Sequence, residues 1–133
     1  MTFVHGKNTF ISIGGVDLSA YASSSDLTRK SDKHDVTTYG KNSHVYFGGL
    51  GDGEGNVSGV YDNSATVGPR AVIRPLIGTI AAIIRRPEGT GAGRPQDAVN
   101  ALIEEYVETA PVADMVTWSV KLQLSDEVTS TTQ

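Results

Sequence analysis

The sequence predicts a mainly β, antiparallel domain, and three stretches carry this prediction. In residues 116–125, apolar and polar side chains alternate strictly, which indicates a strand with one buried and one wet face. In residues 9–18, the Gly14-Gly15 pair separates two short apolar runs and allows the positive φ angles of a tight hairpin. Residues 79–86 form a short apolar run of the kind found in buried strands.

Size and composition limit the possible functions. A chain of 133 residues corresponds to a single domain, which we expect to span residues 1–133. There is no cysteine, so the fold must be held by burial or by partner subunits and not by disulfides. The net charge of −4 argues against a protein that grips DNA through its phosphates. The longest strictly apolar run covers residues 80–84 and is too short to span a membrane, so we expect no membrane partner.

A long polar segment occupies residues 19–55. Serines and mixed charges dominate it, and a connection of this length in a small domain is typical of a functional arm. We therefore predict an arm, of which a long hairpin is one form, that reaches beyond its own subunit. Within it, residues 36–39 and 45–47 suggest brief strands, and the glycine-rich residues 48–55 suggest a flexible turn region before a strand at 56–61.

One short helix is predicted at residues 68–77. Its apolar side chains share one face, while Arg70 and Arg74 share the opposite face. Pro75 is expected to kink the helix or make its last turn irregular, because proline has no N–H. Residues 79–86 are apolar on both sides, so we expect this strand to be covered on both faces, with the helix as one cover.

The pattern of residues 98–108 leaves two interpretations open. Ala98, Leu102 and Tyr106 have helical spacing, yet residues 102–108 also alternate as a strand would. The final residues, 126–133, are polar and lack apolar anchors, which predicts a flexible C-terminal tail.

No stretch carries a catalytic or metal-binding pattern. Residues 52–56 (DGEGN) imitate the start of a calcium loop, but Val57 and Asn63 stand where that loop needs glycine and glutamate. His5, His34 and His44 lack the close spacing of a zinc site. We therefore predict no catalytic residue, no metal and no cofactor, and we do not expect an enzyme.

The ordered motifs of nearly the whole chain resemble the major tail tube proteins of long-tailed bacteriophages. The segments that carry the resemblance are residues 16–21 (VDLSAY), 35–40 (DVTTYG), 49–52 (GLGD), 59–62 (GVYD), 68–78 (GPRAVIRPLIG), 86–89 (RPEG) and 110–119 (APVADMVTWS). The chain departs from the family at Asp126-Glu127, where members often carry a glycine. The order and spacing of the segments carry the resemblance, because each alone is weak.

The resemblance implies a β-sandwich or barrel-like subunit with the helix packed on its outer side. It favours a strand for residues 102–108. Six copies would form a ring with a continuous β-barrel, and rings would stack into a tube that is a passive conduit for genomic DNA. The family further implies tape-measure, tail terminator and tail tip proteins as partners, and a place in the virion after assembly in the host cytoplasm. Two other functions stay open: a monomeric binding or capsid-decoration module, and the inner tube of a contractile tail or secretion machine.

Two groups of residues are candidates for the surface of such a tube. The polar strand face of Thr117, Ser119, Lys121 and Gln123 would line the lumen or coat the outside. A negative field that repels DNA phosphates would come from Glu104, Glu108 and Asp114.

Overall fold

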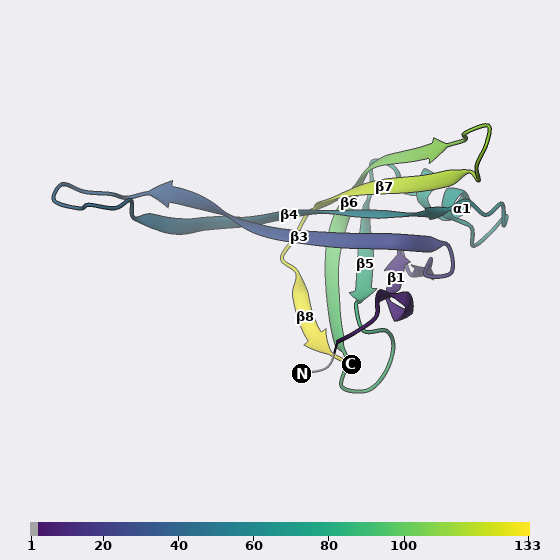
Figure 1. The fold of residues 1–133 in the computed structure, drawn as a ribbon, viewed down its shortest axis with the longest axis horizontal. Helices are drawn as coiled ribbons and strands as arrows, with labels where there is room; N and C mark the ends of the chain where they lie inside the picture. Colours follow the sequence, from purple (N-terminus) through teal and green to yellow (C-terminus); the bar gives the residue numbers. More distant parts are fainter. Residues whose placement is uncertain (1–2) are drawn as a thin grey trace.

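Eight strands form one antiparallel sheet in the computed structural model, which describes residues 3–133 (Figure 1). The order is β2-β1-β5-β6-β7-β4-β3. β8 pairs with the start of β6, on the edge opposite β5. The strands are β1 Phe10–Ile13, β2 Val16–Asp17, β3 Ala22–Asp35, β4 Tyr46–Val60, β5 Ile80–Arg86, β6 Pro95–Thr109, β7 Thr117–Leu124 and β8 Thr129–Thr132. The mainly β, antiparallel and sandwich-like fold class is confirmed. No helix in residues 3–133 is long and apolar enough to cross a membrane.

The strand β6 joins the two halves of the sheet. Its first half pairs with β5 and β8, and its second half pairs with β7. A register shift between Ile103 and Glu105 places a bulge at Glu104, and bulges bend the strand that carries them. β6 changes direction along its length (Figure 1). The strand assignment for residues 102–108 is confirmed. The bulge also explains the ambiguous pattern, because Ile103 is buried before it and Tyr106 faces the same side after it.

The core lies inside the folded sheet. Its largest fully buried side chains include Trp118, Ile13, Leu18, Ile73, Ile103 and Leu122. The Trp118 indole N–H donates a hydrogen bond to the carbonyl oxygen of Tyr21 at 3.3 Å, so the buried ring keeps its polar atom satisfied. The predicted alternation of β7 is confirmed, with Trp118, Val120 and Leu122 buried and the intervening residues not.

The predicted hairpin and helix are both present. β1 and β2 are joined by Gly14 and Gly15, whose φ angles are 61° and 85°. The helix α1 spans Pro69–Ile73 and continues as a 3₁₀ turn, η2, over Arg74–Leu76. Pro75 lies in that turn, which is the irregular ending expected from its missing N–H.

The prediction that β5 is covered on both faces is wrong for the single subunit. Ala81 and Ile83 are buried, but Ile80 on the alternate face is 55% exposed. β5 therefore carries more apolar side chains than its own chain buries.

The segment 19–55 contains most of a long hairpin. β3 and β4 pair almost continuously from Ala22 and Gly59 at the base to Asp35 and Tyr46 near the tip, and the hairpin projects far from the body (Figure 1). Two local predictions are wrong: residues 36–39 form no strand, and the glycine-rich residues 48–55 lie inside β4 instead of a turn. Pairing between distant residues overrides the local turn preference of glycine.

Close packing explains two glycines of β4. A Cβ at Gly59 would meet the carbonyl oxygen of Tyr21, and one at Gly53 would meet the carbonyl oxygen of Thr28. These positions need glycine because other chain atoms approach the backbone, and not because the segment is flexible.

The prediction of a flexible C-terminal tail is wrong for residues 129–133. β8 pairs with Pro95–Ala98 of β6. The Gln133 side chain donates from Nε2 to the Gly89 carbonyl at 2.9 Å and accepts from the Gly91 N–H at 3.3 Å. Backbone hydrogen bonds hold this segment in place without apolar anchors. Such pairing leaves no hydrophobic pattern in the sequence.

Replacing Gly59 with alanine should destabilise the subunit by about 1–3 kcal/mol, because the added methyl group overlaps backbone atoms that cannot move aside. Urea unfolding of the monomer measures this. Gly51→Ala is the matched control, since nothing lies within 4 Å of a Cβ at that position. Equal stability of the two variants would contradict the packing argument.

Candidate self-assembly site

Two free strand edges lie at opposite ends of a four-stranded part of the sheet, in the order β6-β7-β4-β3. On β6, pairing with β5 ends at Leu102, and Ile103 is bonded by Gly78 and Thr79. Beyond it, no strand of residues 3–133 pairs with that edge of 104–109. At the other end, the outer edge of β3 has no partner strand over its whole length within the described residues. Free edges present unpaired N–H and C=O groups and are templates for strand pairing with another chain.

The outer part of the β3–β4 hairpin, which we call the arm, pairs with no third strand among residues 3–133 and contacts the body only near its base. β4 pairs with β7 only from Glu54 onward, so residues 28–35 and 46–53 form a ribbon of two strands. Isolated two-stranded ribbons are marginally stable. The arm also exposes large apolar side chains, among them Phe47 at 68% and Leu50 at 81%. Exposed apolar side chains grouped in this way mark a contact surface.

Local hydrogen bonds shape the tip of the arm. Asp35 Oδ1 accepts hydrogen bonds from the Thr37 hydroxyl at 2.6 Å and from the Thr37 N–H at 3.0 Å. These two bonds hold the pKa of the exposed Asp35 below its usual value. His44 Nδ1 lies 3.5 Å from the other oxygen of Asp35. The turn between the two strands is thus defined by its own side chains.

The four predicted polar residues of β7 share the sheet face opposite the core. Thr117 is exposed, and Ser119, Lys121 and Gln123 are half-buried. Gln123 Nε2 donates to Asp52 Oδ1 and to the Gly53 carbonyl, both at 2.9 Å. On β4, the residues in register with them are Val60, Ser58, Asn56 and Glu54. The result is a broad face, which we call the polar face, made mostly of small uncharged polar side chains.

The three predicted acidic residues occupy three different settings. Glu104 sits at the bulge, and Asp114 lies in the loop between β6 and β7, where it accepts from the Met115 N–H. Glu108 is on the opposite side of β6 from the polar face: its Oε1 accepts from the Tyr106 hydroxyl at 3.0 Å and lies 3.8 Å from Arg70 Nε. The residue that sequence reasoning missed is Glu105, which pairs with Lys121 and is placed on the polar face by the bulge.

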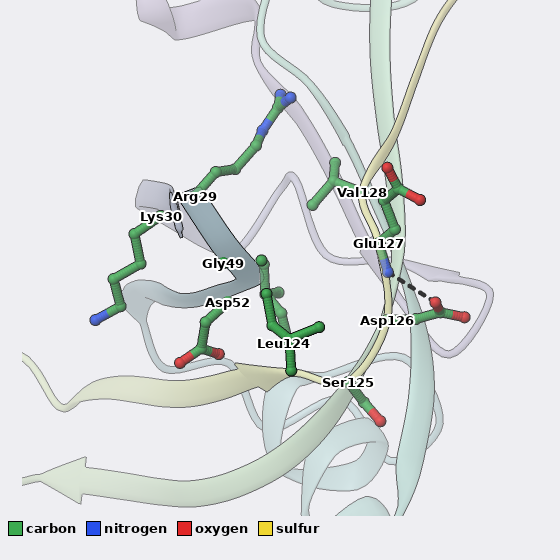
Figure 2. Close-up of a pocket in the computed structure, with 11 residues that line it drawn as sticks. Arg29, Lys30, Gly49, Asp52, Leu124, Ser125, Asp126, Glu127 and Val128 are labelled. Atoms are coloured by element: carbon green, nitrogen blue, oxygen red, sulfur yellow. Dashed lines mark hydrogen bonds between the residues drawn. The ribbon is translucent and has the colours of Figure 1, made fainter. Parts of the chain in front are cut away.

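A cleft of about 670 Å³ lies at the base of the arm (Figure 2). Lys30 and Asp52 come from the hairpin, Leu124 is the last residue of β7, and Glu127 and Val128 come from the connection that leads to β8. Asp52 is hydrogen-bonded to Gln123. Residues 52–56, which resemble the start of a calcium loop in sequence, form part of the strand β4. Among residues 3–133, no three His, Asp or Glu side chains gather closely enough to hold a metal ion.

Comparison with known proteins shows which structures share this fold. No protein-family model matches the sequence, and no curated protein resembles it significantly in sequence. Among solved structures, the chain is similar to one from the SPP1 tail tube, with a TM-score of 0.79, 13% identity, and coverage of 98% of this chain and 80% of that one. It is also similar to a chain from the virion of a native gene transfer agent particle, with a TM-score of 0.77, 13% identity, and coverage of 97% of this chain and 99% of that one.

Tails of related particles share the same fold. A chain from the tail of an empty gene transfer agent particle, solved with C6 symmetry, has a TM-score of 0.75 at 13% identity and covers 97% of this chain and 99% of that one. A chain from the sheath-tube complex of an extracellular contractile injection system has a TM-score of 0.68 at 12% identity, with coverage of 98% and 93%. The fold is therefore the one used in phage tail tubes and in contractile injection tubes.

The environment of Tyr106 gives a measurable consequence. Burial raises the pKa of its phenol, and the Glu108 carboxylate raises it further. In Glu108→Gln, the pKa of Tyr106 should fall but stay above the usual tyrosine value of about 10, because burial is the larger cause. Ultraviolet difference titration against Tyr106→Phe isolates this phenol from the other tyrosines. An unchanged titration in Glu108→Gln would show that the carboxylate does not act on Tyr106.

Proposed function

We propose that this chain is a structural virion subunit, copies of which join into closed rings of six that stack into a tail tube. The single observation that carries the proposal is the pair of free edges at the two ends of one four-stranded sheet. Joining the β3 edge of one copy to the β6 edge of the next satisfies both rows of unpaired backbone groups. The contact is head-to-tail, so it closes into a ring when the rotation per copy is right.

The dimensions of such a ring suit a DNA conduit. Four strands from each of six copies would make a barrel whose backbone is about 45–50 Å across, given the usual strand spacing and a tilt of 35–45°. Side chains would narrow this channel, but it would remain wider than a DNA duplex. The C6 symmetry of the gene transfer agent tail supports the choice of six copies for the same fold.

We place the polar face toward the lumen and the helix α1 on the outside. The charged residues that the register assigns to this face are Asp26, Asp52, Glu54 and Glu105 against Lys30 and Lys121. Such a wall is slightly acidic and lined mainly with serine, threonine and amide side chains, so it would not trap phosphates by counterion release. Passage of DNA would then be passive and non-specific, and the tube would need no catalytic residue or cofactor.

The arm and the C-terminal segment are proposed to contact neighbouring copies or adjacent rings. The arm's two-stranded ribbon and exposed apolar side chains would gain partner strands and burial there. By family analogy, a tape-measure protein would occupy the growing tube, and terminator and tip proteins would close its ends. Assembly would take place in the host cytoplasm before the tube becomes part of the virion.

A second candidate is the inner tube of a contractile device. The likeness to the sheath-tube complex, with a TM-score of 0.68, favours considering it. In that case a sheath protein would bind the outer surface, near α1. Co-sedimentation of assembled tubes with the protein products of neighbouring genes separates the two candidates, because only the contractile device has a sheath.

Electron microscopy of the purified protein tests the main proposal. We expect stacked rings with six-fold symmetry that form hollow tubes, with wall density matching the four-stranded sheet. A protein that stays monomeric at all concentrations and salt conditions would contradict the proposal and favour a monomeric binding or decoration module. Binding to capsids or to a glycan array would then identify that function.

Shortening the arm separates ring formation from stacking. Replacing residues 33–48 with an Asn-Gly dipeptide removes no buried residue, so the subunit should keep its fold. If the arm bridges rings, this variant should lose tubes and leave single rings or monomers in micrographs. Circular dichroism and thermal unfolding check that the core is intact. Normal tubes from the shortened chain would show that the arm is dispensable.

A further inference from the structure

We infer that Lys30 of one subunit lies opposite Glu105 of the next, and that this ion pair fixes the register in which the two free edges join. The inference rests on the proposed ring. It concerns the interaction of the chain with a second copy of itself, and it follows from strand direction, barrel geometry and charge.

Strand direction at the junction is determined by the subunit itself. β6, β7, β4 and β3 are linked by three antiparallel pairings, so β3 runs opposite to β6. Rotation about the tube axis leaves the direction of β6 the same in every copy. The β3 edge of one subunit therefore meets the β6 edge of the next in antiparallel fashion, and the alternation continues around the ring.

The subunit register gives the starting point for the junction. Glu105 pairs with Lys121, Lys121 pairs with Asn56, and Asn56 pairs with Asp26. A barrel without stagger would bring Asp26 back opposite the next Glu105. Closed barrels are staggered, and a tilt of 35–45° shifts pairing by about 1–1.5 residues per strand, which is about four to six residues over four strands. The shift must be even to keep each side chain on its face.

Only one direction of stagger keeps the edges in contact. With an offset of four toward the arm, residues 105–109 of β6 face residues 30–26 of β3. The same offset in the other direction would place them against residues 22–18, where β3 has already ended at Ala22. The free edge of β3 therefore provides partners only on the side of the arm.

Charge then selects the offset. An offset of zero or six would set Glu105 against Asp26 or Asp32, which are like charges, and Asp32 also lies in the register shift of β3. An offset of four sets Glu105 against Lys30. Both side chains are exposed, both belong to the polar face, and neither is held in an ion pair within residues 3–133. Glu105 would then lie between Lys121 of its own chain and Lys30 of its neighbour.

Charge reversal with complementation tests the pair. Lys30→Glu alone and Glu105→Lys alone should each abolish rings and tubes in micrographs, because every junction in the ring brings like charges together. An equimolar mixture of the two variants should assemble, since alternating copies then pair opposite charges at every junction of an even-numbered ring. The double variant should also assemble. Glu88→Lys changes the net charge as Glu105→Lys does, but in the loop after β5, and should leave assembly unchanged.

Disulfide trapping measures the register directly, because the chain contains no cysteine. In assembled tubes, the variant with Lys30→Cys and Glu105→Cys should oxidise to a covalent ladder that ends at the hexamer, since Cβ atoms of opposite residues lie within disulfide reach. Two control variants combine Glu105→Cys with Thr28→Cys or with Asp32→Cys. They would cross-link at an offset of two or six, respectively, and should give little cross-linking.

The outcomes separate this inference from the proposed function. If the wild-type protein forms no rings, the tube itself is refuted. If the wild type forms tubes but both charge variants do so equally well, or the mixture fails to assemble, or the ladder appears with Asp32→Cys instead of Lys30→Cys, the Lys30–Glu105 pair is refuted and the tube stands. Complementation together with the Lys30–Glu105 ladder supports both.

Discussion

The backbone of β6 is the constraint on which the rest of the structure depends. This one strand pairs with β5 and β8 through its first half and with β7 through its second half, and the bulge at Glu104 redirects it between them. The bend lets a single sheet fold over and enclose Trp118, Ile103 and Leu122 without a disulfide. The same bend carries the second half of β6 away from β5, which leaves one of its edges unpaired.

A stable core and an incomplete sheet therefore have one cause. If β6 were straight, β5 could extend along it and cover the edge that the bend exposes. The bend instead leaves a four-stranded unit with free edges at both ends, and residues 3–133 hold no further strand that caps them. Satisfying these edges from neighbouring copies gives a closed barrel without edges, and this links folding to the proposed assembly.

The bulge also determines the character of the two sheet faces. It moves Glu105 to the polar face and turns Glu108 toward Tyr106 and Arg70. The acidic residues of β6 thus fall into separate roles: Glu105 lies at the unpaired edge, and Glu108 contacts Arg70 of α1. A change of one residue in strand register decides which carboxylate lies on the polar face.

Local patterns in the sequence determined much of the fold. Alternation identified β7, the glycine pair identified the first hairpin, and the apolar stripe with Pro75 identified the short helix and its irregular end, because each of these signals comes from neighbouring residues. Only tertiary structure decided the rest. The glycines of β4 predict a turn, and only the pairing with β3 and β7 shows that they lie in a strand. β8 is held by backbone hydrogen bonds to β6 that involve no apolar side chain. Glu105 lies on the polar face because of a bulge. Pairing between distant strands sets all three, and the composition of a short segment does not record it.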